Sequence, residues 1–245
     1  MVRLILVFFF IVVFLLVTLP LLFVLWIIGF KRPDIKERVS LAVIRWVFRV
    51  IAWLAGVRLT ITGQENLPKD ESVLFIGNHR SYFDIVLTYA CATAPMGFIS
   101  KKQVGYIPIL NLWMKNLHCL FLDRDDLKQG LQTILTACDL IKQGVSIVIY
   151  PEGTRNKTED ALLPFHKGSF KIAQKTGCKI IPVTVSRTDD IYESHKPFIR
   201  STAVTMHYGE PVDVASMDTE ERKHLDTTVH AIIEKTYLEM VNTGC

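Results

Sequence analysis

An apolar run near the N-terminus constrains this 245-residue chain more than any other feature. Residues 4–28 carry no charge and a single polar side chain, Thr18. A helix of that length crosses a hydrocarbon core of about 30 Å, whereas a signal peptide has a shorter apolar region that ends in small residues. The run therefore predicts a retained membrane anchor over residues 1–30. Pro20 is expected to kink the helix, and a kinked helix either spans the bilayer or re-enters it.

Basic residues cluster directly after this run. Residues 31–60 carry seven Lys or Arg side chains against Asp34 and Glu37, whereas the chain beyond residue 60 has a net charge of −2. The positive-inside rule places the basic side in the cytoplasm, where anionic lipid headgroups attract it. A slightly acidic globular part argues against nucleic-acid binding. We therefore expect a protein at the cell membrane, with its globular domain on the cytoplasmic side and no nucleic-acid partner.

The basic segment contains a second predicted helix, Lys36–Ala55. Arg38, Arg45 and Arg49 are seven and eleven residues apart, so they fall on one narrow stripe of a helix that is otherwise nearly all apolar. This pattern predicts a basic amphipathic helix over residues 31–56 that lies in the membrane interface with its arginines among the phosphates. The alternative is a helix packed in the protein core with a solvated stripe.

From residue 57 onward, predicted strands and helices alternate. Residues 145–150 form a run that is apolar except for Ser146, which is typical of a central strand buried on both faces. The alternation predicts an α/β fold over residues 57–245, a three-layer domain with a mostly buried mixed sheet flanked by helices. The expected strands are 57–62, 73–76, 119–122, 145–150, 179–185 and 202–208; the expected helices are 83–92, 125–143, 169–175 and a last helix with a capping box at Asp218 and Glu221.

The cysteines indicate neither a disulfide framework nor a metal site. The chain has five, an odd number, and none is spaced as CxxC. Most lie in apolar runs, where a free thiol behaves as a small hydrophobic group. The sequence thus favours a reduced compartment, with no metal and no cofactor.

A histidine followed five residues later by an aspartate occurs twice. His79 follows a predicted strand and precedes a predicted helix, so the intervening loop can bring its side chain to Asp84, which would fix the tautomer of the imidazole and stabilise the imidazolium. His118 and Asp123 lie in a predicted strand instead, where side chains five residues apart point to opposite faces. The first pair is therefore the predicted base and its orienting carboxylate.

The tetrapeptide Glu152-Gly153-Thr154-Arg155 directly follows the predicted central strand. Gly153 permits close approach of the backbone, and Arg155 offers a planar fork for a phosphate. Glu152 does not bind phosphate itself, but it can orient an arginine or accept a hydrogen bond from a substrate hydroxyl. This pattern predicts an anion-binding turn; the alternative is a surface turn with a weak ion pair.

Two further basic residues are candidates for substrate binding. Arg124 stands just past the end of the strand 119–122, where open α/β sheets usually bind ligands. Lys101 follows a short apolar segment, and it is either a substrate-binding residue or a solvated charge.

These motifs resemble those of the glycerolipid acyltransferase family, and within it the bacterial 1-acyl-glycerol-3-phosphate (lysophosphatidic acid) acyltransferases, from about residue 31 to 210. The resemblance is carried by residues 78–84 (NHRSYFD), 121–124 (FLDR), 151–155 (PEGTR) and 181–183 (IPV). It implies His79 as general base with Asp84 as its partner, and a site for the acceptor's glycerol phosphate at Arg124, Glu152, Gly153 and Arg155. One difference is visible, because members of the family commonly have glycine where His118 stands.

The resemblance implies transfer of a fatty acyl group from acyl-CoA or acyl carrier protein to the free hydroxyl of 1-acyl-glycerol-3-phosphate, which gives phosphatidic acid. No residue stands out as a covalent nucleophile, so direct transfer is expected. One alternative is an acyltransferase for another lysophospholipid or an aminolipid. The others are a membrane-bound thioester hydrolase and a non-catalytic lipid-binding protein, the last of which the intact His79–Asp84 pair disfavours.

Overall fold

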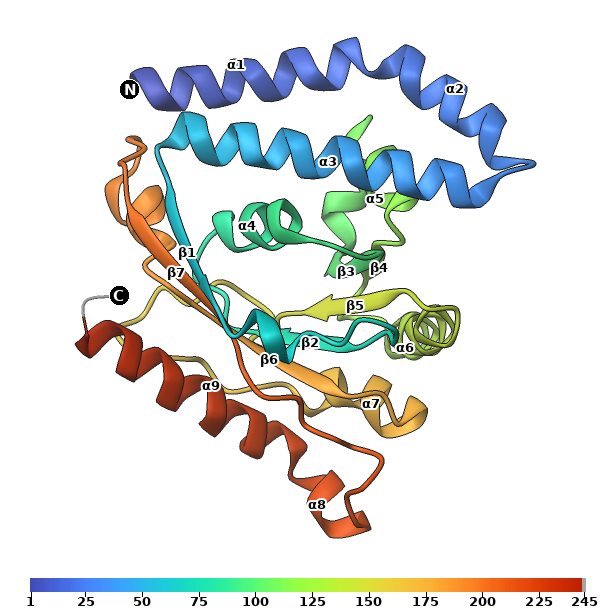
Figure 1. Ribbon diagram of the computed structural model, residues 1–245, viewed down its shortest axis with the longest axis vertical. Coiled ribbons are helices and arrows are strands. Elements are labelled where there is room, and N and C mark those ends of the chain that lie inside the picture. Colours follow the sequence, from blue (N-terminus) through green and yellow to red (C-terminus); the bar gives the residue numbers. More distant parts are fainter. Residues whose placement is uncertain (244–245) are drawn as a thin grey trace.

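The computed structural model describes residues 1–243 and has an α/β fold built on one seven-stranded sheet (Figure 1). The strands are β1 (Arg58–Thr62), β2 (Leu74–Gly77), β3 (Met96–Lys101), β4 (Leu120–Leu122), β5 (Ser146–Ile149), β6 (Ile180–Ser186) and β7 (Ala203–Tyr208). The α-helices are α1 (Val2–Val17), α2 (Leu19–Gly29), α3 (Pro33–Ala55), α4 (Phe83–Cys91), α5 (Leu110–Asn116), α6 (Leu127–Lys142), α7 (Lys171–Thr176), α8 (Thr219–Lys223) and α9 (Leu225–Asn242).

The sheet is mixed, as the sequence predicted. Its strand order is β1-β7-β6-β2-β5-β3-β4, and within it β6 and β7 are antiparallel while every other neighbouring pair is parallel. Residues 146–149, a serine followed by three apolar residues, form β5, which lies between β2 and β3 and is buried along its whole length. Because β2 to β6 all run in one direction, their carboxyl ends meet at one edge of the sheet, the usual position of a ligand site in such folds.

Alternate side chains of the central strands enter two separate cores. Phe75 of β2 packs in a cluster with Leu87 of α4, whereas its neighbour Ile76 packs with Ala137 of α6 and Val229 of α9. Helices therefore cover both faces of the sheet, α4 and α5 on one and α6, α7 and α9 on the other (Figure 1). This arrangement is the expected three-layer domain.

The N-terminal apolar run forms two helices that meet at a bend. Pro20 stands in the first turn of α2, after the break at Thr18, and the two helix axes differ by 47°. Within residues 1–243, neither of these helices nor any other is by itself long and apolar enough to cross a bilayer; α1 and α2 together reach the required length and hydropathy across the bend.

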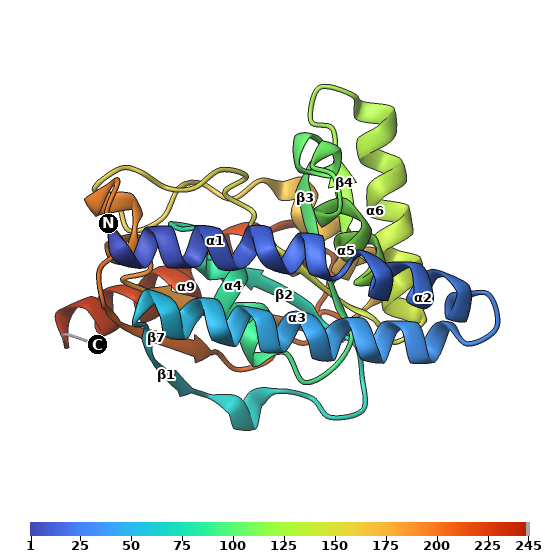
Figure 2. The same ribbon diagram turned by 90° about the horizontal axis from the view of Figure 1, so that it is seen from above.

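Helix α3 lies between α4 and the α1–α2 pair (Figures 1 and 2). It buries Leu41, Ile44 and Val47. One face of α3 is therefore packed in the protein core, as the alternative to an interfacial helix predicted. Its outer side nevertheless exposes Trp46 and Trp53, which are 59% and 76% accessible. The interfacial role of this helix stays a prediction.

Some elements differ from the sequence-based expectation. Strand β3 and helix α5 were not anticipated, because Gly97 interrupts the apolar pattern of β3 and α5 is only seven residues long. The predicted last helix is two helices, since the chain breaks at His224 after a capping box formed by Asp218 and Glu221. His118 has a φ of 57°, in the left-handed region that favours glycine. Glycine adopts this conformation readily, in agreement with the glycine that the family resemblance implied at this position.

Candidate active site

The loop between β2 and α4 brings the His79 and Asp84 side chains together. His79 Nδ1 lies 2.8 Å from Asp84 Oδ2, and the same oxygen accepts hydrogen bonds from the backbone N–H groups of Arg80 and Ser81, both at 2.8 Å. The carboxylate is buried, whereas the His79 side chain is 15% exposed. Because the ionised carboxylate accepts the Nδ1 proton, Nε2 is left as the basic nitrogen, and it makes no hydrogen bond with any of residues 1–243.

Two partners hold the loop in place from either side. The Asn78 side chain donates to Val185 O and accepts from Val185 N, at 2.9 and 2.8 Å, so it continues the pairing of β2 with β6 beyond the strand end. The Tyr150 ring stacks on the imidazole of His79, with ring centroids 4.4 Å apart and an interplanar angle of 10°. Tyr150 was not singled out from the sequence, although it stands directly before the 151–155 motif.

Glu152 is buried beneath this loop and faces the protein backbone. Its Oε1 accepts a hydrogen bond from His79 N at 2.7 Å, and its Oε2 accepts one from Leu163 N at 3.0 Å. Burial raises the pKa of this carboxyl to about 7, against the opposing effect of the two backbone donors. Both oxygens thus fix loop geometry; neither contacts an arginine.

Arg155 belongs to a second polar cluster that tethers the start of α4. Its Nη1 donates to Glu193 Oε1 at 2.9 Å, its Nη2 donates to the Tyr82 hydroxyl at 3.1 Å, and its guanidinium lies 3.7 Å from the centroid of the Tyr82 ring. Glu193 also accepts from Ser81 Oγ at 2.6 Å and from Tyr82 N at 3.0 Å. Sequence analysis missed Glu193, because no motif surrounds it and it lies 112 positions from Ser81.

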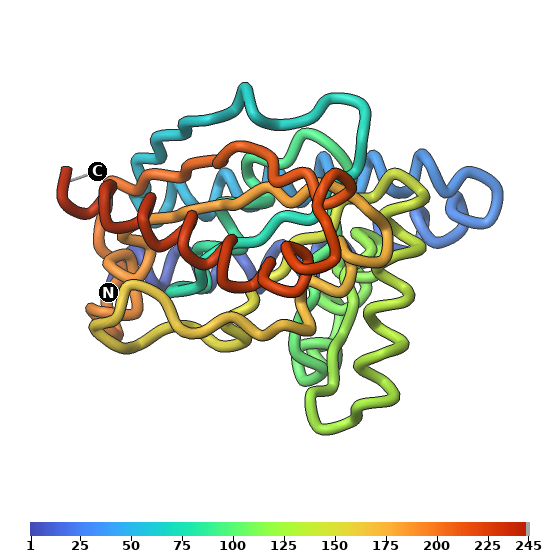
Figure 3. Tube along the Cα trace, turned by 90° about the horizontal axis from the view of Figure 1, so that it is seen from below, coloured from blue at the N-terminus to red at the C-terminus, as the bar shows by residue number. Residues whose placement is uncertain are grey.

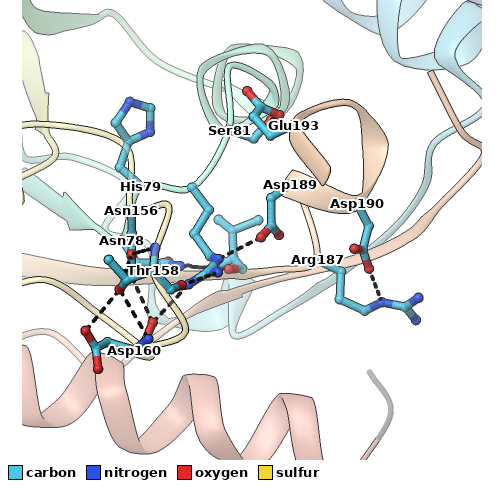
Figure 4. Close-up of polar contacts among 12 residues, drawn as sticks. Asn78, His79, Ser81, Asn156, Thr158, Asp160, Arg187, Asp189, Asp190 and Glu193 are labelled. Carbon is cyan, nitrogen blue, oxygen red and sulfur yellow. Dashed lines mark hydrogen bonds and ion pairs between the residues drawn. The ribbon is translucent and has the colours of Figure 1, made fainter. Parts of the chain in front are cut away.

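Arg80 joins the His79 loop to two distant segments. Its Nε donates to Asp189 Oδ2 at 2.9 Å, and its two terminal nitrogens donate to the carbonyl oxygens of Asp160 and Thr158. Figure 4 shows Thr158 and Asp160 below His79 and Asp189 to the right, while the His79 ring points away from all three. The polar side chains around the loop therefore pair with one another, and the imidazole of His79 points away from them.

A pocket of about 760 Å³ opens beside this loop at the carboxyl ends of β3, β4 and β5. Tyr150 is part of its wall and connects it to His79. Among the predicted site residues, Lys101, Arg124 and Gly153 line it. Thr154, Arg155, Glu152 and His79 are not among its lining residues.

Arg124 and Gly153 lie side by side in this pocket. Gly153 has a φ of 72°, and a Cβ atom at this position would lie 3.0 Å from Arg124 Nη1 and 3.0 Å from His166 Cδ2, so a larger residue would be crowded as well as strained. Arg124 makes no hydrogen bond or ion pair within residues 1–243, and partial desolvation lowers its pKa. The guanidinium is therefore available to an anionic ligand.

The second His–Asp pair does not form a site. His118 Nε2 lies 2.9 Å from Glu37 Oε2 on α3, and Asp123 Oδ2 lies 2.9 Å from Lys102 Nζ. The described part of the chain contains no group of three His, Cys, Asp or Glu side chains placed to hold a metal ion.

The fold and this geometry define a class of protein: an α/β enzyme with an imidazole–carboxylate pair at a strand end, beside a basic pocket. The Acyltransferase family model matches residues 58–186, which contain all of these groups except Glu193 and Asp189. The chain belongs to this family and is an O-acyltransferase. The family resemblance that the motifs predicted is thereby confirmed.

Individual relatives agree with the family. The chain is 31% identical over 201 residues to the 1-acyl-sn-glycerol-3-phosphate acyltransferase of Borreliella burgdorferi, which covers 81% of this chain and 79% of that protein. It is 24% identical to the human 1-acyl-sn-glycerol-3-phosphate acyltransferase beta, over 83% of this chain and 73% of that one. The crystal structure of the 1-acyl-sn-glycerophosphate acyltransferase PlsC from Thermotoga maritima superposes with a TM-score of 0.83 at 25% identity, covering 97% of this chain and 94% of that one.

Proposed function

We propose that the protein transfers a fatty acyl group from an acyl thioester, acyl-CoA or acyl carrier protein, to the free hydroxyl of 1-acyl-glycerol-3-phosphate, giving phosphatidic acid. The observation that carries this proposal is the oriented imidazole of His79, hydrogen-bonded to Asp84 through Nδ1, beside a pocket that contains the unpaired Arg124. The named activities of the relatives support the choice of acceptor.

His79 acts as the general base in this mechanism. Its Nε2 removes the proton of the acceptor hydroxyl, and the hydroxyl oxygen then attacks the thioester carbonyl. Asp84 keeps the imidazole in the tautomer that can take this proton and stabilises the resulting imidazolium. A positioned base contributes typically 10²–10⁴-fold to the rate, and correct orientation of the two substrates contributes further.

The acceptor phosphate binds in this pocket at Arg124, which supplies a planar cation. The missing side chain at Gly153 leaves room for this guanidinium. Lys101 adds a second positive charge in the same pocket. Thr154 and Arg155 remain candidate acceptor-binding residues, although Arg155 is engaged by Glu193 and Tyr82 in the structure without ligand.

The membrane supplies both lipid substrates in this proposal. Residues 1–30 anchor the chain, residues 31–56 lie in the interface, and residues 57–245 form the catalytic domain on the cytoplasmic side. Large apolar side chains exposed on α1 to α3 support this arrangement, among them Phe9, Phe23, Trp26 and Trp53. The exposed side chains of Trp26, Trp46 and Trp53 are well suited to the headgroup region.

An acceptor panel tests the proposal. Full-length protein in vesicles receives labelled acyl-CoA together with lysophosphatidate, another lysophospholipid, an aminolipid or no acceptor, and lipid mass spectrometry identifies the products. We expect phosphatidic acid to dominate and to disappear with His79→Ala. Release of free fatty acid with every acceptor would instead identify a thioester hydrolase, and preferential acylation of another lipid would replace the proposed acceptor.

A further inference from the structure

The pocket is lined by leucines of α6 that are exposed, although the apolar face of a helix is usually buried in the core. The sequence pattern placed Leu127 and Leu131 on one apolar face of α6 together with Cys138 and Ile141, but the structure buries only the later part of that face. Leu127 is 89% exposed and Leu131 is 56% exposed, and both line the pocket. Together with Ile134 they form an apolar wall about two helical turns long.

Another part of the pocket lining is basic. Lys171 and Lys175 lie one turn apart on α7, and both line the pocket. Neither makes a hydrogen bond or an ion pair with any residue in the described range 1–243. The acidic groups of the pocket are otherwise engaged, because Asp123 pairs with Lys102 and Asp126 accepts a hydrogen bond from Gln129 N at the start of α6. We call these two parts of the lining, Leu127, Leu131, Ile134, Lys171 and Lys175, the α6–α7 groove.

We propose that the α6–α7 groove binds the 4′-phosphopantetheine arm of the acyl-thioester donor, a chemical group that acyl-CoA and acyl carrier protein share. This inference rests on the proposed acyl transfer and identifies where its donor lies. The arm carries a phosphate, which suits the two unpaired lysines. It also carries methyl and methylene groups, which suit the leucine wall. The acceptor's single phosphate is served by Arg124, so the groove lysines remain for the second substrate.

The groove also leads toward the reacting atoms. Its walls belong to the same pocket as Tyr150, whose ring stacks on His79. An arm whose phosphate lies between α6 and α7 therefore points its sulfur end toward the imidazole. In the transfer step the acceptor oxygen bonds to the carbonyl carbon, the carbon–sulfur bond breaks, and the thiolate takes the proton that His79 Nε2 removed from the acceptor. The free thiol is left in the groove.

Steady-state kinetics of the full-length enzyme test this site. The double variant Lys171→Gln/Lys175→Gln removes both groove charges. The matched control, Lys128→Gln/Lys142→Gln, removes two exposed lysines of α6 that do not line the pocket. Donors are acyl-4′-phosphopantetheine and acyl-pantetheine, which differ by the phosphate alone. Acyl-CoA and acyl carrier protein are run in parallel to distinguish the two natural sources.

Wild type and the control should use the phosphorylated donor with a KM about tenfold lower than the unphosphorylated one, as expected for charge-assisted contacts at an accessible site. The groove variant should lose this preference while its KM for lysophosphatidate stays unchanged. The inference is overturned if the groove variant keeps the preference, if its acceptor KM rises instead of the donor KM, or if its loss appears with acyl-CoA alone, which would assign the lysines to the nucleotide. The donor comparison uses whichever acceptor the panel identifies, so a wrong acceptor assignment would not alter its result.

Discussion

The loop that carries His79 and the pocket beside it differ in whether their charged side chains have partners within the protein. In the loop, the charged side chains already have partners: Asp84 accepts three hydrogen bonds through one oxygen, and Glu152 accepts two from backbone donors. In the pocket, Arg124, Lys171 and Lys175 have no hydrogen-bond or ion-pair partner within residues 1–243. The two regions lie next to each other, at the same edge of the sheet.

The difference separates two requirements of catalysis. A general base needs a fixed tautomer and direction before the substrate arrives, and a network closed within the protein provides both. A site for anionic substrates needs cations that no protein carboxylate neutralises, since an internal ion pair would compete with the ligand. Variants in the loop should therefore change turnover or stability, whereas variants in the pocket should change substrate affinity.

The largest effect is expected from His79→Ala. Removal of the base should lower kcat by about 10³–10⁴-fold while KM values, circular dichroism and membrane association stay close to wild type. The control is His118→Gly, which removes the other histidine at a position whose φ of 57° suits glycine, and which should remain active. Near-normal turnover by folded His79→Ala would place the base elsewhere.

Asp84→Asn should be almost as severe. The amide can present its nitrogen or its oxygen to Nδ1, so the tautomer is no longer fixed, and losses near 10³-fold are expected. The three donors at Asp84 Oδ2 also lose their charged acceptor, and thermal stability should fall by several degrees. Retained kcat together with reduced stability would show that Asp84 is structural alone.

Glu152→Gln tests the buried carboxylate through pH. Its folded pKa of about 7 lies above the unfolded value of about 4.3, so the protonated form is favoured by folding. The stabilising contribution is present below pH 4.3 and is lost as pH rises to 7. Wild type should thus lose about 3 kcal/mol of unfolding free energy across this range relative to Glu152→Gln, measured by denaturant titration at several pH values. Parallel curves for the two proteins would contradict this assignment.

Arg124→Ala tests the pocket, the second of the two regions compared. Loss of a guanidinium–phosphate contact should raise KM for lysophosphatidate about 10–100-fold and leave the donor KM within about twofold of wild type. Arg155→Ala is the informative companion, because Arg155 is already paired with Glu193. If Arg155 acts mainly in the loop network, its variant should lower kcat and stability more than acceptor affinity.

The smallest effect is expected outside both regions, at the exposed Arg38 of α3. Each basic group near an anionic surface contributes about 1 kcal/mol at low salt, so Arg38→Gln should weaken vesicle binding about fivefold, and less at high salt. Lys235→Gln on α9, on the other side of the sheet, is the matched control and should bind normally (Figure 3). Equal behaviour of the two variants in vesicle flotation would argue that α3 does not contact headgroups.

The elements predicted correctly from sequence have strong local signals. The mostly apolar run 146–149 forms the buried β5, and the Asp218–Glu221 capping box formed where its spacing predicted. The misses have weak or misleading local signals. The apolar pattern of β3 is interrupted by Gly97, and Leu127 has the periodicity of a buried residue while being exposed. Periodicity identifies the apolar face of a helix, but it does not say whether another element covers that face.

The sequence by itself determined the α/β class, the bend near Pro20, the contact between His79 and Asp84, and the family to which the chain belongs. These features depend on neighbours within a few positions, where side-chain spacing and backbone preference act directly. Tertiary structure alone decided that Glu152 faces His79 N, that Glu193 holds Ser81 and Arg155, and that Lys171 and Leu131 line one pocket. These contacts join segments up to 112 positions apart, and only the packing of helices on both faces of the sheet brings their side chains within hydrogen-bonding distance or into one pocket.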